Sequence, residues 1–582
     1  MAPLVFEATA TSRSWDALVS QMAAADNAGL YAPLRTVTTM AQTEDSRQHA
    51  LISGALQAVV RAMAMDEAGV LVSACQALVA IVQNGSTRKQ AAVDAGVLSA
   101  LVDAMAVHPD EWMVAEEVLT TLEVLFCSSA SSGRREREAL DAGVPRAVCN
   151  TMSLHEERPG VQELGCRVLR VLSSTAELST AAFAANATVS AGALTQINPA
   201  MRAHASDARV QKECCAALGA IIARSETRRI AAVESEVVAV LAQAARAQSP
   251  AVSAAALEPL AELANGPDAC RIALLEAGVL GALGSALAAH SADAELAQRA
   301  CLCVGSLALV APQWQLQVGS ESVRLVAAAM RGHVSEARVQ EAGISALLNL
   351  ITNSRARKQA AASTEVVGAV AASMHAHLQH AQLQIWGCTF ARVLGNDGNG
   401  ARIALVEGSA LHAILAALGA HKGNLDVQQW GLLAVAAIAV GPLERSVVEA
   451  GAAKAAVRAL GAHLQHKGCC ELALEMLLSL AADKGAGQQA VAAEGAALVP
   501  LLKKLRKVHP EGASVRGLVD RLGKELSGPS RRSSVARSAR ISQPVSAEPA
   551  AEPAAEPAVA SAAELTAAPA AESDAPEAAH PV

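Results

Sequence analysis

Apolar residues recur along most of this chain with the period of an α-helix. In the stretch VLSALVDAM, from Val97 to Met105, apolar side chains stand at positions i, i+3, i+4 and i+7. This spacing gathers them on one face of a helix and leaves the polar side chains on the other. Similar stretches follow one another through most of the sequence. The pattern predicts a chain of amphipathic helices and therefore an all-α fold.

One stretch is repeated many times. Its clearest copies begin at Val161 (VQELGCRVLRVL), Val210, Val339, Leu383 and Val427, and weaker copies begin at Val70, Val114, Val252, Leu296 and Cys469. Successive copies start 42 to 49 residues apart. A nearly constant period of this length is typical of a solenoid, in which each unit buries its apolar face against its neighbours.

A second block lies between successive copies. It reads RKQAAVDAGVLSALVDAM at Arg88–Met105 and ERSVVEAGAAKAAVRAL at Glu444–Leu460. A glycine stands just before the last helix of the block, at Gly96, Gly143, Gly278 and Gly451. Glycine there permits a tight turn and a close approach of helices. Each unit is therefore expected to hold a short lead-in, a helix, a loop and a second amphipathic helix.

These motifs resemble the armadillo family, in the form with an H-x5-VQ-x2-GC unit that is abundant in algae and protists. The HEAT repeat, which is similar in length, is the structural alternative. The resemblance implies a right-handed α-solenoid of about eleven armadillo-like units over residues 14–527. A degenerate unit around Arg47 and Gly54 is expected at the N-terminal end of the solenoid, and a half-unit at Val515–Leu526 at its C-terminal end. The last helix of each unit would line a long concave surface of the kind that scaffolds and adaptors use.

Composition agrees with this architecture. Hydrophobic residues make up 52% of the 582 residues, yet the chain has one Tyr and four Phe, so Ala, Leu and Val must form the core. The net charge of −8 favours neither nucleic acid nor an anionic membrane as a partner. The longest apolar run, Trp430–Leu443, is shorter than the ~18 residues that a membrane span needs. Residues 1–13 are expected to be flexible and show no secretory signal, which predicts a cytoplasmic protein.

Histidine recurs six residues before the repeat starts, at His108, His155, His204, His290, His333, His377, His421, His463 and His509. Neighbouring units would place these side chains about 10 Å apart. Zinc ligands must instead converge within about 2 Å of one ion. We therefore expect them to cap helix ends rather than to bind metal.

Cysteine and arginine also follow the repeat. Five cysteines lie five residues after a repeat start, where other units have Leu or Ile: Cys75, Cys166, Cys215, Cys301 and Cys388. A position shared by Cys, Leu and Ile is a core position, so these thiols are expected to pack rather than react. Arginines seven or eight residues before the glycine position are expected to pair or cap: Arg88, Arg135, Arg228, Arg271, Arg357 and Arg402.

Motifs for catalysis are lacking in the sequence. It has no Walker loop, no GxGxxG after a strand, no GxSxG and no paired acid constellation. We therefore predict no catalytic, cofactor-binding or metal-binding residues and no enzymatic activity. The sequence also departs from nuclear-import adaptors of the armadillo family, which repeat Trp and Asn on the groove helix. Trp386 and Trp430 lie on the earlier helix, and the groove is expected to be weakly charged.

The C-terminal part is unevenly charged. Residues 503–540 hold eleven Lys or Arg against three acids, whereas residues 541–582 hold seven acids and no Lys or Arg. Residues 528–582 are expected to form a disordered Ala/Pro/Glu-rich tail with a basic, Ser-rich start. The predicted basic patch comprises Lys503, Lys504, Arg506, Lys507, Arg516, Arg521, Lys524, Arg531 and Arg532, and Ser534 is the best-placed phosphorylation site.

Two interpretations of this end stay open. In one, it is a solvated cap with a flexible tail. In the other, the basic patch binds an acidic surface and the acidic tail competes for it. For the whole chain we predict a scaffold or adaptor that binds other proteins. A cargo-transport or chaperone-type receptor, and a ciliary or cytoskeletal scaffold, are the alternatives.

Overall fold

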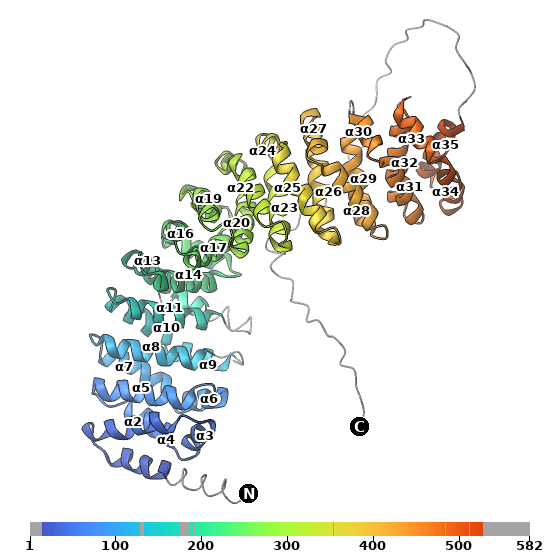
Figure 1. Cartoon of the computed structure of the whole chain (residues 1–582). Coiled ribbons are helices and arrows are strands. Elements are labelled where there is room, and N and C mark those ends of the chain that lie inside the picture. The colour runs from blue at the N-terminus through green and yellow to red at the C-terminus, as the bar shows by residue number, and fades with distance from the viewer. Residues whose placement is uncertain are drawn as a thin grey trace, which may run out of the picture. The chain divides into compact units, whose positions relative to one another are not determined.

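The computed structural model describes residues 14–127, 133–174, 185–190, 192–352, 354–440, 443–482, 485–510 and 512–527 (Figure 1). Every regular element within these ranges is a helix, which confirms the all-α prediction for them. The predictions of a flexible segment at residues 1–13 and of a disordered tail at residues 528–582 lie outside the described residues.

Most of the helices repeat in groups of three. A short helix such as α6 (Ser86–Asp94) is followed by a helix of eleven residues such as α7 (Val97–Val107), and then by a long helix such as α8 (Trp112–Phe126). We call these the short, closing and long helices. The chain divides into two compact units, residues 1–299 and 300–582, which meet in the sequence inside α20 (Ala294–Leu307).

The first unit begins with a helix from residue 14, η1 (Ala28–Leu30) and α2 (Tyr31–Met40). Its long helices are α5 (Ala68–Val82), α8, α11 (Pro159–Ser173), α14 (Ala208–Ile222), α17 (Pro250–Ala264) and the start of α20. Its closing helices are α4 (Ala55–Ala62), α7, α10 (Val144–Leu154), α13 (Ala193–Ala203), α16 (Val237–Ala245) and α19 (Val279–Ala289). Its short helices are α3 (Glu44–Ile52), α6, α9 (Arg134–Asp141), residues 185–190, α15 (Glu226–Glu234) and α18 (Asp268–Glu276).

The second unit follows the same order. Its long helices are α23 (Ala337–Thr352), α26 (Ala381–Gly395), α29 (Leu425–Ile438), α32 (Lys467–Ala482) and α35 (Ala513–Ser527). Its closing helices are α22 (Glu321–Gly332), α25 (Thr364–Ala376), α28 (Ala410–Ala420), α31 (Ala452–Ala462) and α34 (Gly495–Val508). Its short elements are η2 (Pro312–Trp314) with α21 (Gln315–Val318), α24 (Arg355–Ala361), α27 (Asn399–Glu407), α30 (Glu444–Glu449) and α33 (Ala486–Ala493).

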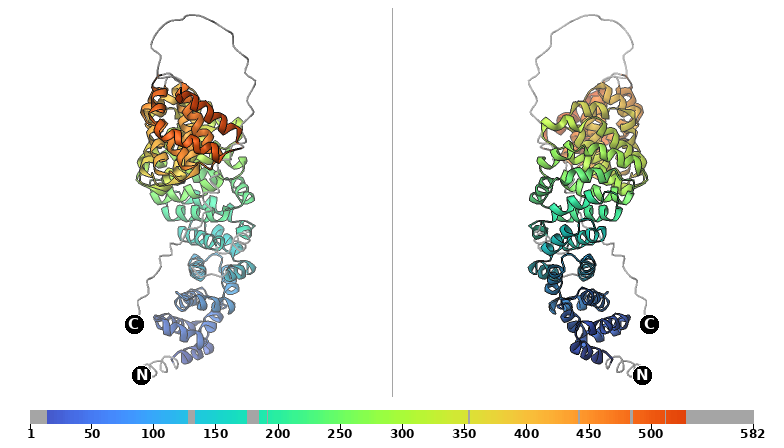
Figure 2. Two further views of the ribbon diagram at one scale, coloured as in Figure 1. Left: turned by 90° about the vertical axis from the view of Figure 1, so that its right-hand side faces the viewer. Right: turned by 90° about the vertical axis from the view of Figure 1, so that its left-hand side faces the viewer.

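Helices of one kind stack on the next helix of that kind. Within the first unit α5 packs on α8, α8 on α11 and α11 on α14, while α7 packs on α10 and α10 on α13. Within the second unit α26 packs on α29 and α29 on α32, while α25 packs on α28 and α28 on α31. Figure 2 shows these successive layers from two further sides. The core between them consists mainly of Ala, Leu, Val and Ile side chains, with buried Met and Cys. This stacking is the repeat-solenoid arrangement that the sequence period predicts.

Eight of the closing helices begin directly after a residue with positive φ, whereas α22, α25 and α34 do not. Gly96 and Gly451 have φ values of 88° and 92°, so each turns the chain in the left-handed region directly before α7 and α31. Glu236 and Ser409 occupy the same place before α16 and α28 with φ values of 59° and 66°. The predicted tight turn is therefore confirmed, and it is kept where the residue is not glycine.

The helical part of the apolar run that starts at Trp430 ends at Ile438, where the long helix α29 stops. Among the described residues, no single helix is long and apolar enough to cross a membrane.

Candidate protein-binding surface

Most of the closing helices expose the same two positions. Counted from the positive-φ residue, the third and seventh positions face outward, as Ser99 and Asp103 do on α7 and Lys454 and Arg458 do on α31. The positions between them are buried on α31 and buried or half-buried on α7. A row of outward positions thus runs along each stack of closing helices, because like helices pack on like.

In the second unit this row becomes basic toward its C-terminal end. The helices α28, α31 and α34 contain no Asp or Glu, and α28 packs on α31 as α31 packs on α34. Together they expose six cations: Lys454, Arg458, Lys503, Lys504, Arg506 and Lys507. His412 on α28 occupies the third position of its helix and is also exposed. We call the surface formed by Lys454, Arg458, Lys503, Lys504 and Lys507 the basic row.

These cations have few carboxylates to neutralise them. Arg506 forms an ion pair with Asp520 of α35 at 2.5 Å. Arg458 donates only a long hydrogen bond, 3.4 Å, to the carbonyl of Lys454 within its own helix. No residue of the basic row forms an ion pair with a carboxylate in the part of the chain that the structure describes. Their charges are therefore available to a ligand.

The structure brings part of the predicted basic patch together. Lys503, Lys504, Arg506 and Lys507 lie on α34, and the remaining described members lie on α35, which packs against α34. Arg516 donates to the carbonyl of Pro510 at 2.9 Å and so has a structural role. Arg531, Arg532 and Ser534 lie outside the described residues.

Lys454, Arg458 and His412 were not singled out by the sequence. They lie one and two repeats before the predicted patch, so a count of local charge did not include them. Their position in the repeat is the signal that could have found them, because Arg458 matches Lys504 on α34 and Lys454 matches His412 on α28. The expectation of a weakly charged groove is therefore wrong for α31 and α34.

Six of the nine recurrent histidines join neighbouring units through their rings rather than capping their own helix. Each of His204, His290, His377, His421, His463 and His509 places Nε2 within 2.7–3.0 Å of a backbone carbonyl one repeat earlier. His421, for example, contacts the carbonyl of Leu378, the residue that follows His377. Each of these histidines lies at the end of a closing helix, as predicted, but its ring contacts a backbone carbonyl of the previous unit. This contact gives the regular histidines a structural role.

In five units a glutamine adds a second contact, between adjacent helices of the same unit. Gln384, in the VQ or LQ position of α26, donates from Nε2 to the carbonyls of Met374 and His377 at 2.9 Å each. Gln428 makes the same pair of bonds to Leu418 and His421. The side chain is buried and satisfies two carbonyls at the end of a closing helix. The H-x5-VQ spacing is thus explained by hydrogen bonding between adjacent helices.

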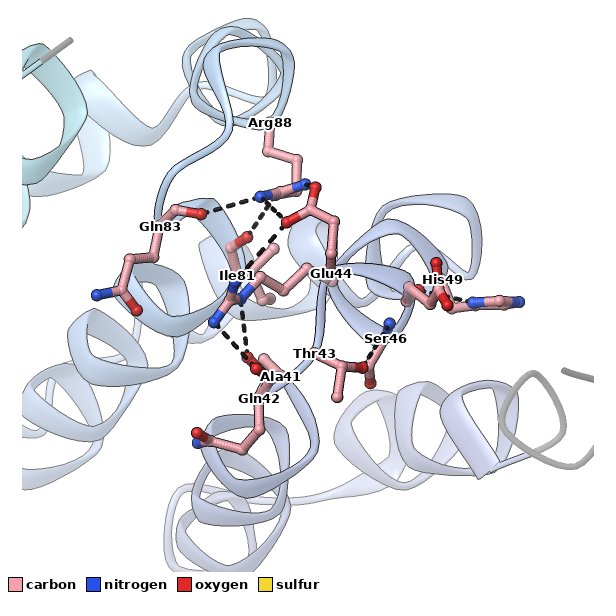
Figure 3. A network of polar contacts seen from close by, with 11 residues as sticks. Ala41, Gln42, Thr43, Glu44, Ser46, His49, Ile81, Gln83 and Arg88 are labelled. Carbon is pink, nitrogen blue, oxygen red and sulfur yellow. Dashed lines mark hydrogen bonds and ion pairs between the residues drawn. The ribbon is translucent and has the colours of Figure 1, made fainter. Parts of the chain in front are cut away.

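The recurrent arginines cap the long helices. Arg88 is buried, and its Nε donates to the carbonyl of Ile81 at 2.8 Å while Nη2 donates to that of Gln83 at 2.9 Å (Figure 3). Glu44, one repeat earlier, pairs with the same guanidinium, which holds the pKa of its carboxyl below the usual value. The bond to the carbonyl seven residues earlier recurs at Arg228, Arg271, Arg357 and Arg402. Their role is structural, as expected.

The cysteines of the repeat are core residues. All five are fully buried, and burial raises the pKa of the Cys75, Cys301 and Cys388 thiols to about 12. Cys166 lies 3.4 Å from Cys214, sulfur to sulfur, as a free thiol. Within the described ranges, no group of three or more His, Cys, Asp or Glu is arranged to hold a metal ion.

Comparisons with known proteins support the fold and do not extend to function. No family model matches this chain, and no curated protein matches it. An engineered protein of known crystal structure has 18% sequence identity and a TM-score of 0.51, and the match covers 88% of this chain and 99% of the engineered one. Two further engineered proteins, 22% and 21% identical, match 44% and 43% of this chain with a TM-score of 0.39. The first likeness agrees with an all-helical repeat fold.

Proposed function

We propose that this chain is an armadillo-type, right-handed solenoid of about eleven units that acts as a non-enzymatic scaffold or adaptor. Three features support the armadillo assignment: the three-helix unit, the turn before most closing helices, and the histidine bonds between units and glutamine bonds within them. A rigid stack that presents the same positions in every layer is suited to holding an extended partner.

The partner that we propose is an acidic segment of another protein, held on the basic row. The observation that carries this proposal is the run of three stacked closing helices without a single carboxylate and with five unpaired cations. Because adjacent helices pack about 8–10 Å apart, the cations of α31 and α34 could contact acids two or three residues apart in an extended chain. Lys and Arg provide point charges and forked donors, both of which suit carboxylates.

Binding of this kind should be strongly sensitive to salt. Exposed ion pairs contribute about 0.2–1 kcal/mol each, so several must act together, and each is screened over a Debye length of about 8 Å at physiological ionic strength. The charges of the basic row are exposed and lie on neighbouring layers. We therefore expect a reversible interaction whose association rate falls as salt rises.

A labelled peptide of alternating Glu and Ser residues tests this proposal by fluorescence anisotropy. The full-length protein should bind it at low salt, and the variant K454E/R458E/K504E should bind it at least about tenfold more weakly. The control K212E/R338E/K422E makes the same change in net charge at exposed cations elsewhere. Equal losses in both variants would show that only overall charge matters and would contradict a defined site.

A further inference from the structure

A second outward-facing feature lies in the first unit and is apolar. Of the large hydrophobic side chains that the structure shows exposed there, three occupy one position of the repeat, eleven residues after the positive-φ residue. They are Met65, Val107 and Leu154, with 37%, 55% and 59% of the side chain exposed. They follow or end the consecutive closing helices α4, α7 and α10. We call them the apolar row.

The solenoid itself does not require large side chains at this position. Later units place Ala or Gly there: Ala203, Ala247, Ala289, Gly332, Ala376, Ala420 and Ala462. The half-buried Val508 on the last closing helix is the exception. Because most layers stack with a small residue, the exposed side chains of the apolar row do not serve stacking. Exposing them to water is unfavourable, at about 25 cal/mol per Å² of apolar surface.

A cavity accompanies the row. Met65 and Val107 line one depression of about 260 Å³, together with Met63, Ala104 and Asp103. The positions just before the row carry the small side chains Ala64, Ala106 and Ser153, all exposed. Met113, 53% exposed, lies just after the turn that follows Val107. These features leave room for an apolar side chain of a partner between the layers.

The same three layers are also the most acidic at this edge. The turns after the apolar row each carry two adjacent acids: Asp66 and Glu67, Asp110 and Glu111, Glu156 and Glu157. No later turn between a closing and a long helix holds two within the described residues. Arg158, the one cation among these three turns, stacks over the Trp112 ring at 4.7 Å. Large apolar side chains and doubled acids thus occur in the same layers.

We infer that the apolar row with its acidic turns binds a basic amphipathic helix of a partner protein. Adjacent layers place the apolar side chains about 8–10 Å apart. In a helix, residues seven apart are about 10.5 Å apart along the axis, so one apolar residue per heptad matches the layers. Lys or Arg residues of the partner helix, next to each of its apolar residues, would lie near the acidic turns. A helix also satisfies its own backbone, whereas an extended chain would need polar partners in every layer, and Ala64 and Ala106 offer none.

The test uses three labelled 21-residue helical peptides and the full-length protein. The first has Leu every seventh residue flanked by Lys, the second replaces Lys by Glu, and the third moves the Leu residues out of register. We expect the first to bind, and to bind at least about tenfold more weakly to M65A/V107A/L154A. The control I230A/I403A/V440A removes three exposed apolar side chains elsewhere and should bind like the native protein.

Each other result would overturn the inference. It fails if no peptide binds the native protein, if the Glu peptide binds as tightly as the Lys peptide, or if the alanine variant keeps its affinity. Because alanine occupies this position in other layers, M65A/V107A/L154A should keep the native circular dichroism and melting temperature. Should it not fold, D110K/E156K/E157K changes only exposed charges and must weaken the Lys peptide and not the Glu peptide.

Discussion

At the scale of single residues, the repeat decides which side chains are available for chemistry. The chain has twelve cysteines, all free thiols, yet only Cys127 is exposed. Six of the nine recurrent histidine rings contact backbone carbonyls of the previous unit, and the recurrent arginines donate to carbonyls of the long helices. Residue types that often mark an active site are here used to join helices, which is why their regular spacing alone does not indicate a reaction.

The thiols provide a direct check of this assignment. Because the thiolate is the reactive form and burial raises the pKa of Cys75, Cys301 and Cys388 to about 12, these residues should not react near pH 8. We expect Ellman's reagent to modify one thiol rapidly in the native protein, at Cys127, and all of them in guanidinium. Rapid native modification of any cysteine of the repeat position would contradict the packing described for the long helices.

At the scale of the helix, a capping arginine fixes the end of one element and the start of the next. Arg357 is buried and donates to the carbonyls of Leu350 and Gln315 and to the side chain of Gln315. It has no carboxylate partner among these contacts, so burial lowers its pKa. Lysine cannot replace this fork, because its single ammonium cannot reach the same set of acceptors.

We therefore expect Arg357→Lys to destabilise the end of α23 and the start of α24 by about 2 kcal/mol, the cost of leaving buried carbonyls without donors. Hydrogen exchange of the amides in these two helices measures the effect locally. Arg355→Lys, at an exposed position of the same short helix, is the matched control and should exchange like the native protein. Equal exchange in the two variants would mean that Arg357 does not cap α23.

At the scale of the whole molecule, features that recur could be predicted from the sequence. The period, the turn at Gly96 and Gly451, and the core position of Cys75 each appear in many copies, so the pattern averages over local irregularities. Features that belong to a few layers could not be predicted in this way. Whether Lys454 faces the same side as Lys504 depends on how the closing helices stack, and six of the recurrent histidine rings contact a carbonyl in another unit.

The charge pattern of the closing helices therefore emerges when equivalent positions of successive layers are compared, rather than neighbouring positions in the sequence. The last closing helices carry cations without acids, whereas the turns after α4, α7 and α10 carry paired acids beside exposed apolar residues. The adaptor that we propose could use these two surfaces of opposite character to select different partners.

The central claim, that the basic row selects an acidic partner, is tested most directly by affinity capture from the cells that express the protein. Tagged native protein and K454E/R458E/K504E are compared by quantitative mass spectrometry at low and high salt, with K212E/R338E/K422E as the charge-matched control. The account predicts partners that carry acidic segments, that are lost from the first variant and at high salt, and that remain with the control. A set of partners unchanged by K454E/R458E/K504E would contradict it.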